Sequence, residues 1–206
     1  MSKNKDITPR GKSRRGFLKG AGITTAGTIV LQSGVLAADL QKREESKVSG
    51  PGALTIELHV NGKMLKASIE PRATLAEVLR DQLQLTGTKV VCDRGSCSAC
   101  TVWIEDKPVN ACMTFAMDVG ERKVTTIEGL ANNGELHPIQ ESFIDHDATQ
   151  CGFCTSGMIM STAALLEENP SPSIEDVKHA TRGNYCRCGT YPHVFKATLA
   201  AAEKTK

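Results

Sequence analysis

The sequence predicts an α+β protein in which a small sheet-forming segment precedes a helical one. Between residues 55 and 126, apolar and polar residues alternate in short runs, as they do in half-buried strands. From residue 137 onward, apolar residues recur at helical spacing, and helix-capping residues lie between the runs. Eight cysteines are divided equally between the two segments. Each half of the protein is therefore expected to hold a site of its own.

The first segment opens with a hairpin, because Asn61 and Gly62 form a strong signal for a tight turn between two alternating runs. A helix is expected over residues 74–83, since Thr74 can cap its first turn and Glu77, three residues later, completes a capping box. The result is a small, half-open sheet wrapped on one helix. The expected strands are residues 55–60, 63–69, 101–105 and 123–126.

The second segment is expected to fold as a bundle of four helices. Pro138 stands where a helix begins, a position that favours proline, and Ser173 with Asp176 gives another capping signal. The expected helices are residues 138–146, 158–166, 173–181 and 192–202.

The cysteines fall into two sets with different spacings. The first set runs C-x4-C-x2-C-x11-C, and a C-x4-C-x2-C core with a distant fourth cysteine is the pattern of plant-type [2Fe–2S] ferredoxins. The second set runs C-x2-C-x31-C-x-C, which that pattern does not describe. Two four-thiolate iron–sulfur sites in different settings are the simplest interpretation. The ligands would be Cys92, Cys97, Cys100 and Cys112 in the first site and Cys151, Cys154, Cys186 and Cys188 in the second.

Disulfides and structural zinc are the alternatives for eight cysteines. A chain of this length can bury a core without disulfides. A zinc ribbon uses two C-x2-C pairs around one ion, whereas here the pairs Cys97/Cys100 and Cys151/Cys154 lie in segments of different character. The C-x-C at residues 186–188 also fits a ribbon poorly. Histidine ligands are not expected, because soft thiolates are available for every position.

The N-terminus carries a second signal. Residues 13–19, SRRGFLK, form a twin-arginine export sequence, and an uncharged run follows over residues 20–38. This run is too polar for a stable membrane anchor. We therefore expect a signal peptide over residues 1–37, a linker over residues 38–52 and a location in the periplasm. The twin-arginine route carries proteins already folded around their cofactors, which agrees with iron–sulfur sites.

The charge of the chain excludes one class of function. Removal of residues 1–37 takes away seven basic residues and one acidic residue, so the formal net charge changes from +2 to −4. No basic surplus is then left to bind nucleic acid. No nucleotide-binding loop and no nucleophile triad is evident either.

Four motifs occur in a specific order: CDRGSCSAC at residues 92–100, LHPIQ at 136–140, QCGFCT at 150–155 and GNYCRC at 183–188. Together they resemble the iron–sulfur subunit of the xanthine oxidase family of molybdenum hydroxylases. The resemblance covers roughly residues 53–203. With the export signal, the chain is most similar to the small subunits of periplasmic aldehyde oxidoreductases.

The resemblance implies a β-grasp ferredoxin-like domain at residues 53–130 and a helical-bundle domain at residues 131–206, each with one [2Fe–2S] cluster. In this family a separate large subunit holds the molybdopterin cofactor near the bundle's cluster, and the other cluster faces a FAD subunit or a cytochrome. The chain would carry electrons and perform no bond chemistry itself. A free-standing exported ferredoxin is the alternative. Aldehydes, N-heterocycles and purines all remain open as substrates of the complex.

The resemblance also assigns roles to individual residues. Gln150 matches the family's pterin-contacting glutamine, and Cys188 matches the ligand that also approaches the pterin. A solvated or helix-capping side chain is the alternative for Gln150. Ser98 departs from the family, which usually has glycine there, so its side chain must point away from the cluster or hydrogen-bond near it. Trp103 and Phe115 are expected in the core.

Overall fold

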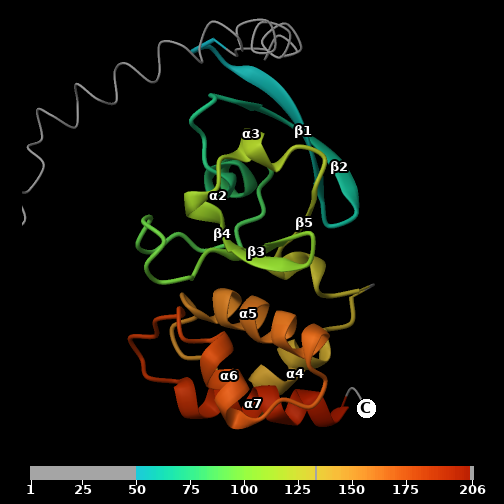
Figure 1. Ribbon diagram of the computed structural model, residues 1–206, viewed down its shortest axis with the longest axis vertical. Coiled ribbons are helices and arrows are strands. Elements are labelled where there is room, and N and C mark those ends of the chain that lie inside the picture. Colours follow the sequence, from blue (N-terminus) through green and yellow to red (C-terminus); the bar gives the residue numbers. More distant parts are fainter. Residues whose placement is uncertain (1–49, 133, 205–206) are drawn as a thin grey trace, which may run out of the picture. The chain divides into compact units, whose positions relative to one another are not determined.

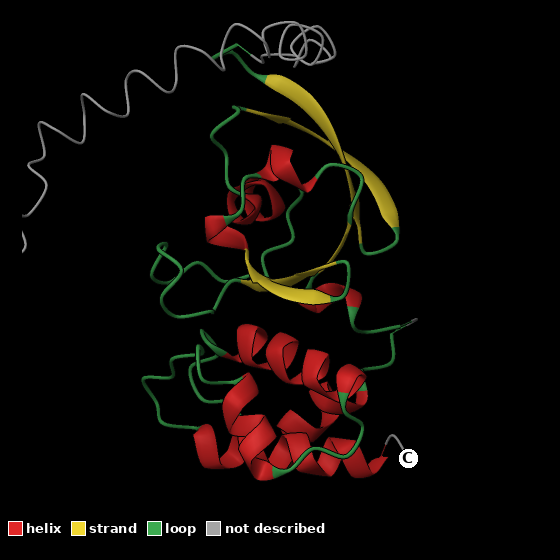
Figure 2. Cartoon of the chain, viewed as in Figure 1, coloured by secondary structure: helices red, strands yellow, loops and turns green. Residues whose placement is uncertain are grey.

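The computed structural model describes residues 50–132 and 134–204. The expected signal peptide and most of the expected linker lie outside these residues. A five-stranded sheet occupies the first half of the described chain and a group of helices the second, as expected of an α+β protein (Figures 1 and 2). Within the described residues, no helix is both long enough and apolar enough to cross a lipid bilayer.

The sheet has the strand order β2-β1-β5-β3-β4. The hairpin strands β1 and β2 pair antiparallel, β5 lies parallel to β1, and β3 is antiparallel to both β5 and β4. The sheet is therefore mixed. The strands are β1 (Leu54–Val60), β2 (Lys63–Ile69), β3 (Thr101–Ile104), β4 (Lys107–Asn110) and β5 (Lys123–Thr125).

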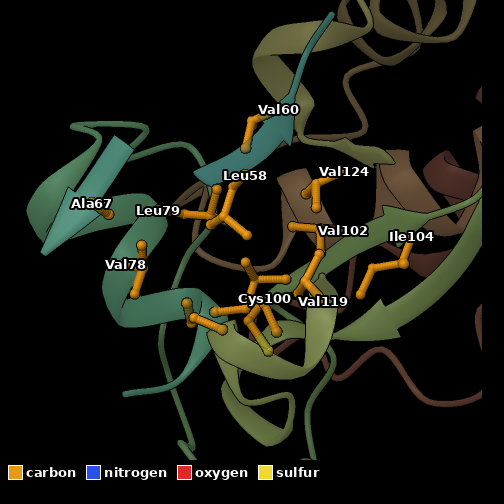
Figure 3. Packing of buried hydrophobic residues seen from close by; sticks show 14 of the residues in the cluster. Leu58, Val60, Ala67, Val78, Leu79, Cys100, Val102, Ile104, Val119 and Val124 are labelled. Carbon is orange, nitrogen blue, oxygen red and sulfur yellow. The ribbon is translucent and has the colours of Figure 1, made fainter. Parts of the chain in front are cut away.

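The helix expected after the hairpin is present in two parts, α2 (Leu75–Glu77) and the wider turn η1 (Val78–Gln82). Its capping box is confirmed: the Glu77 N–H donates to the Thr74 hydroxyl at 3.3 Å, and the Glu77 carboxylate accepts from the Thr74 N–H at 2.7 Å. Leu79 is fully buried among the apolar side chains of the strands (Figure 3). The helix thus closes the core of the sheet half.

β4 was not among the expected strands. It contains Pro108, which cannot donate a ladder hydrogen bond, and it lies at the edge of the sheet, where proline is tolerated. Phe115 was expected in the core, and that expectation is wrong, since its side chain is 50% exposed. The next residue, Ala116, takes the buried position instead. The remaining short elements of this half are η2 (Ala111–Met113), α3 (Ala116–Val119) and η3 (Ile127–Gly129).

All four helices expected in the second half are present. The largest difference is in α5, which begins directly after Cys154 rather than at residue 158. Their buried faces form a second core, separate from that of the sheet half. The helices are α4 (Pro138–Asp145), α5 (Thr155–Glu168), α6 (Ile174–Ala180) and α7 (Tyr191–Lys204).

The sheet half packs on the helical half through β3, β4 and α5 (Figure 1). Trp103 of β3 is buried, as expected, and it belongs to the core of the helices. Its indole N–H donates to the carbonyl of Met160 in α5 at 2.9 Å. Farther along the same contact, a Cβ on Gly157 would lie 2.1 Å from the backbone oxygen of Ser98. Only glycine therefore fits where α5 meets the cysteine loop that precedes β3.

Candidate metal centres

The structure brings the four cysteines of the first set together. The thiols of Cys92 and Cys97 interact, and Cys100 interacts with both Cys97 and Cys112. Cys92 is half-buried and the other three are buried. All four are free thiols, so each is available as a metal ligand.

The loop that carries three of these thiols is shaped by left-handed residues. Asp93 and Ser98 have φ angles of +52°, and Gly95 has a φ of +70°. Turns of this kind direct successive backbone N–H groups to one side, where they form the concave sites that hold anions and iron–sulfur clusters. One such group, the N–H of Ser96, donates to the sulfur of Cys92 at 3.3 Å. The loop backbone is thus suited to surround a negatively charged cluster.

The four cysteines of the second set are also gathered, although they come from two distant segments. Cys151 and Cys154 directly precede α5, whereas Cys186 and Cys188 lie in the connection between α6 and α7. Cys154 interacts with Cys151 and Cys186, and Cys188 interacts with the same two residues. Cys151 and Cys188 are exposed, while Cys154 is buried. This site therefore opens at the surface of the chain.

Within each set the hydrogen-bonding thiols form two pairs. In the described residues, no three side chains of the metal-binding types surround one point as the ligands of a single ion would. A four-cysteine [2Fe–2S] cluster contains two irons, and two thiolates bind each of them. Two neighbouring pairs of thiols fit that arrangement. The pairs are Cys92/Cys97 and Cys100/Cys112 in the first set, and Cys151/Cys188 and Cys154/Cys186 in the second.

The protonation of the thiols also fits a bound cation. Burial raises the pKa of Cys100 and that of Cys154 to about 12, so neither would ionise at neutral pH without a positive charge beside it. Iron bound between the thiols would supply that charge and displace the proton. By contrast, a hydrogen bond from the backbone of Arg94 lowers the pKa of Cys92 to about 7. Each site thus includes a buried thiol that needs the metal in order to lose its proton.

The second site has neighbours that the cysteine spacing did not reveal. Burial raises the pKa of Cys186, but hydrogen bonds from Thr190, Cys154 and Gly189 together outweigh this effect and lower the pKa to about 7. The Thr190 hydroxyl lies 3.3 Å from the Cys186 sulfur. The Tyr191 hydroxyl accepts from the Cys186 N–H at 2.8 Å and donates to the Asn184 carbonyl at 3.0 Å. These side chains hold the loop around Cys186.

The two sites are joined by direct contacts of the backbone. The carbonyl of Cys97 accepts a hydrogen bond from the N–H of Tyr185, the residue before Cys186, at 3.1 Å. The side-chain amide of Asn184 donates to the Ser98 carbonyl at 3.1 Å. A Cβ on Gly183 would lie 3.1 Å from the Ser98 hydroxyl oxygen, so the Ser98 side chain points toward Gly183.

Gln150 lies beside the exposed part of the second site. Its side chain is exposed and forms no hydrogen bond with any other described residue. It caps neither neighbouring helix, since α4 ends at Asp145 and the N-cap of α5 is Cys154. Nearby Phe153 and Tyr185 are 60% and 64% exposed. The amide of Gln150 is thus free to contact a partner at this surface.

Comparisons with known proteins agree with two iron–sulfur domains. A family model described as a 2Fe–2S iron–sulfur cluster binding domain matches residues 58–126, and one described as a [2Fe–2S] binding domain matches residues 126–199. The first half is thus the β-grasp domain that the sequence motifs implied.

Two curated relatives match along most of their length. The chain is 36% identical over 209 residues to the aldehyde oxidoreductase iron-sulfur-binding subunit PaoA of Escherichia coli O157:H7, covering 94% of this chain and 90% of that protein. It is 38% identical over 151 residues to the nicotinate dehydrogenase small FeS subunit of Eubacterium barkeri, covering 73% and 96%.

A solved structure shows the same fold. In the crystal structure of quinoline 2-oxidoreductase from Pseudomonas putida 86, a chain superposes with a TM-score of 0.71 at 40% identity, covering 73% of this chain and 94% of that one. The two [2Fe–2S] domains follow one another in the expected order. The chain therefore belongs to the family of small, electron-transferring iron–sulfur subunits of the molybdenum hydroxylases related to xanthine oxidase.

Proposed function

We propose that this chain carries electrons in the periplasm from a large molybdopterin-binding subunit to an external acceptor, through two [2Fe–2S] clusters. A cluster, when bound, supplies one-electron chemistry. The chain supplies the thiolates that hold it, the amides that surround it and the surfaces that partners contact. The proposed ligands are the four cysteines of each set, Cys92, Cys97, Cys100 and Cys112 for the first cluster and Cys151, Cys154, Cys186 and Cys188 for the second.

The observation that carries this proposal is the hydrogen bond of 3.1 Å between the Cys97 carbonyl and the Tyr185 N–H. Cys97 is a ligand of the first site, and Tyr185 is bonded directly to Cys186, a ligand of the second. A short series of covalent bonds and one hydrogen bond therefore connects the two sites. Cys97, at one end of this connection, is buried, whereas the side chain of Tyr185 at the other end is exposed.

The surfaces of the chain suggest the direction of transfer. At the second site the exposed Cys151, Cys188 and Gln150 form the face on which we place the molybdopterin subunit, with Gln150 and Cys188 toward the pterin. At the first site, Val91 and Met113 are 55% and 62% exposed beside the cysteine loop, and we place the acceptor there. A cytochrome and a flavin subunit both remain candidates for that acceptor.

The relatives and the N-terminus support proposals for the substrate class and the location. The curated relatives include components of an aldehyde oxidoreductase and a nicotinate dehydrogenase, and we therefore propose an aldehyde or an N-heterocycle as the substrate of the complex. The twin-arginine sequence at residues 13–19 supports export of the folded chain. The boundaries 1–37, 38–52, 53–130 and 131–206 remain those proposed from the sequence.

Metal analysis of the native complex tests the proposal. Protein purified without oxygen should contain about four iron and four acid-labile sulfides per chain, as two [2Fe–2S] clusters require. It should also copurify with a larger molybdopterin subunit. Cys151→Ala and Cys92→Ala should each remove the signal of a different cluster in electron paramagnetic resonance. Stoichiometric zinc without iron, or loss of both signals from either variant, would contradict the assignment.

A further inference from the structure

Thr190 is a buried polar residue beside the second site whose hydroxyl has one partner. Its side chain is 5% exposed, and its Oγ1 lies 3.3 Å from the sulfur of Cys186. Among the described residues, it is the one side chain other than cysteine that is hydrogen-bonded to a cysteine sulfur. At its position in the fold, a threonine hydroxyl would ordinarily bind a backbone N–H group instead.

Thr190 stands where the chain enters α7. Its backbone carbonyl accepts hydrogen bonds from the N–H groups of His193 and Val194, both at 3.0 Å, which is the position of a helix N-cap. A threonine at an N-cap ordinarily uses its hydroxyl to accept from an N–H group of the first turn, and this stabilises the helix. Here the hydroxyl forms no such bond and is directed at Cys186 instead.

The surrounding loop keeps the two groups in contact. The Tyr191 hydroxyl binds both the Cys186 N–H and the Asn184 carbonyl, so the loop between them is closed on both sides. Asn184 is itself 2% exposed and is tied to the first site by its hydrogen bond to the Ser98 carbonyl. These hydrogen bonds hold the backbone of Cys186 beside Thr190.

We propose that Thr190 is a positioning residue that sets the reduction potential of the second cluster. The proposal rests on the assignment of Cys186 as a ligand of that cluster. A ligand thiolate has no proton to give, so the Thr190 hydroxyl must be the donor of this hydrogen bond. The Thr190 hydroxyl would donate a stronger hydrogen bond to a cluster in its reduced state, because a reduced cluster would carry more negative charge on its sulfurs. The bond thus favours the reduced state and raises the potential.

Redox titration of the cluster-loaded complex tests this. Thr190→Val keeps the shape of the side chain and removes the hydroxyl, whereas Thr190→Ser keeps the hydroxyl. Each cluster is followed by electron paramagnetic resonance. In Thr190→Val the equilibrium constant for reduction of the second cluster should be about tenfold smaller, so its reduction potential should fall by about 59 mV for one electron. Thr190→Ser should leave it close to that of the unmodified protein, and the first cluster should not change in either variant.

Thr198→Val is the matched control. Thr198 is also buried, and its hydroxyl donates to the Val194 carbonyl at 2.8 Å within α7, away from the cysteines. The same substitution there should leave both potentials unchanged. An unchanged second potential in Thr190→Val, or an equal shift of both clusters, would overturn the proposal.

Measurement of the iron content distinguishes failure of this proposal from failure of the assignment of Cys186 as a ligand. If Thr190→Val does not retain the second cluster, Thr190→Ala gives the comparison with Thr190→Ser, because it removes the same hydroxyl with less bulk. Loss of the cluster from both hydroxyl-free variants would overturn the role in setting the potential and make Thr190 a residue of cluster assembly. Cys186→Ala, by contrast, tests only whether Cys186 is a ligand, through the loss of iron.

Discussion

Gln150 is the residue whose proposed role can be separated from cluster ligation. Its exposed amide has a donor and an acceptor, which suits the polar edge of a pterin at a subunit interface. We expect Gln150→Ala to keep both clusters but to weaken the contact with the large subunit, by about 1–3 kcal/mol if pterin groups are left unpaired. The rate of cluster reduction after mixing the complex with substrate should fall.

Rapid-mixing spectroscopy of the assembled complex and the affinity between the subunits provide the measurement. Thr149→Ala is a suitable control, since Thr149 is the exposed neighbour on the same segment. If Gln150→Ala behaves as this control does, Gln150 is a solvated surface residue and the family's role does not apply to it.

At this scale the sequence predicted which cysteines lie together in each set, but it did not predict the residues around them. Cysteine spacing is a strong signal because a cluster needs thiolates at set distances. The hydroxyls of Thr190 and Tyr191 carry no such signal, since they contact Cys186 only after the connection before α7 has folded back. Ser98 was expected to point away from the cluster or to bond near it, and its side chain points toward Gly183.

At the scale of elements, α5 depends on one glycine. A Cβ on Gly157 would lie 2.1 Å from the Ser98 carbonyl oxygen and 2.9 Å from the Cα of Ala99, which are backbone atoms that cannot turn aside. We expect Gly157→Ala to destabilise the cluster-loaded protein by about 1–3 kcal/mol, as overpacking does. A lower thermal unfolding midpoint would show this.

Gly183→Ala is the control at the same contact. A Cβ there would lie 3.1 Å from the Ser98 hydroxyl oxygen, which belongs to a side chain that can rotate. Its unfolding midpoint should fall less. If the two substitutions lower the unfolding midpoint equally, Gly157 is not required by the close packing of α5 on the cysteine loop.

The first turn of α4 should respond to pH. The His137 Nδ1 accepts from the Ile139 N–H at 3.3 Å, which only the neutral ring can do. Burial lowers the pKa of His137 from its usual 6.5, although the charge of Glu167 opposes this. The unfolded chain therefore takes up the proton first. The stabilisation from this cap is complete above pH 6.5 and is lost as the pH falls below that value.

His137→Asn supplies the comparison, because asparagine caps a helix without titrating. Between about pH 7.5 and 5.5, the thermal midpoint of the unmodified protein should fall further than that of the variant, by the equivalent of about 1 kcal/mol or less. Parallel pH profiles would show that the charge of this ring does not affect the helix.

The sequence predicted best those elements whose signals lie within a few residues of them in the chain. The capping residues Thr74 and Ser173 and the helix-starting Pro138 lie at the first turns of the helices that they predicted, and helices begin there. β4 was missed because its pairing with β3 depends on tertiary structure, while Pro108 argues against a strand locally. α5 starts earlier than the apolar run that predicted it, since Cys154 stands at its N-cap position and the small or polar residues Thr155–Gly157 form its first turn.

At the scale of the whole molecule, export should depend on the paired arginines. Replacing Arg14 and Arg15 by lysine should leave cluster-loaded protein in the cytoplasm, because the twin-arginine route recognises that pair. Fractionation of cells, with iron and complex activity measured in each fraction, tests this. Full transport of the variant with its clusters would show that another signal directs it.

Trp103 gives this molecule a probe that needs no label. It is the one tryptophan in the chain, and its indole ring joins β3 to α5 through Met160. Iron–sulfur clusters absorb at the wavelengths where tryptophan emits, so bound clusters should keep its fluorescence weak. Loss of the clusters would brighten the emission without changing its colour, and separation of the two halves would then shift it to the red. Cofactor loss and the opening of the protein could thus be followed as two events in one cuvette.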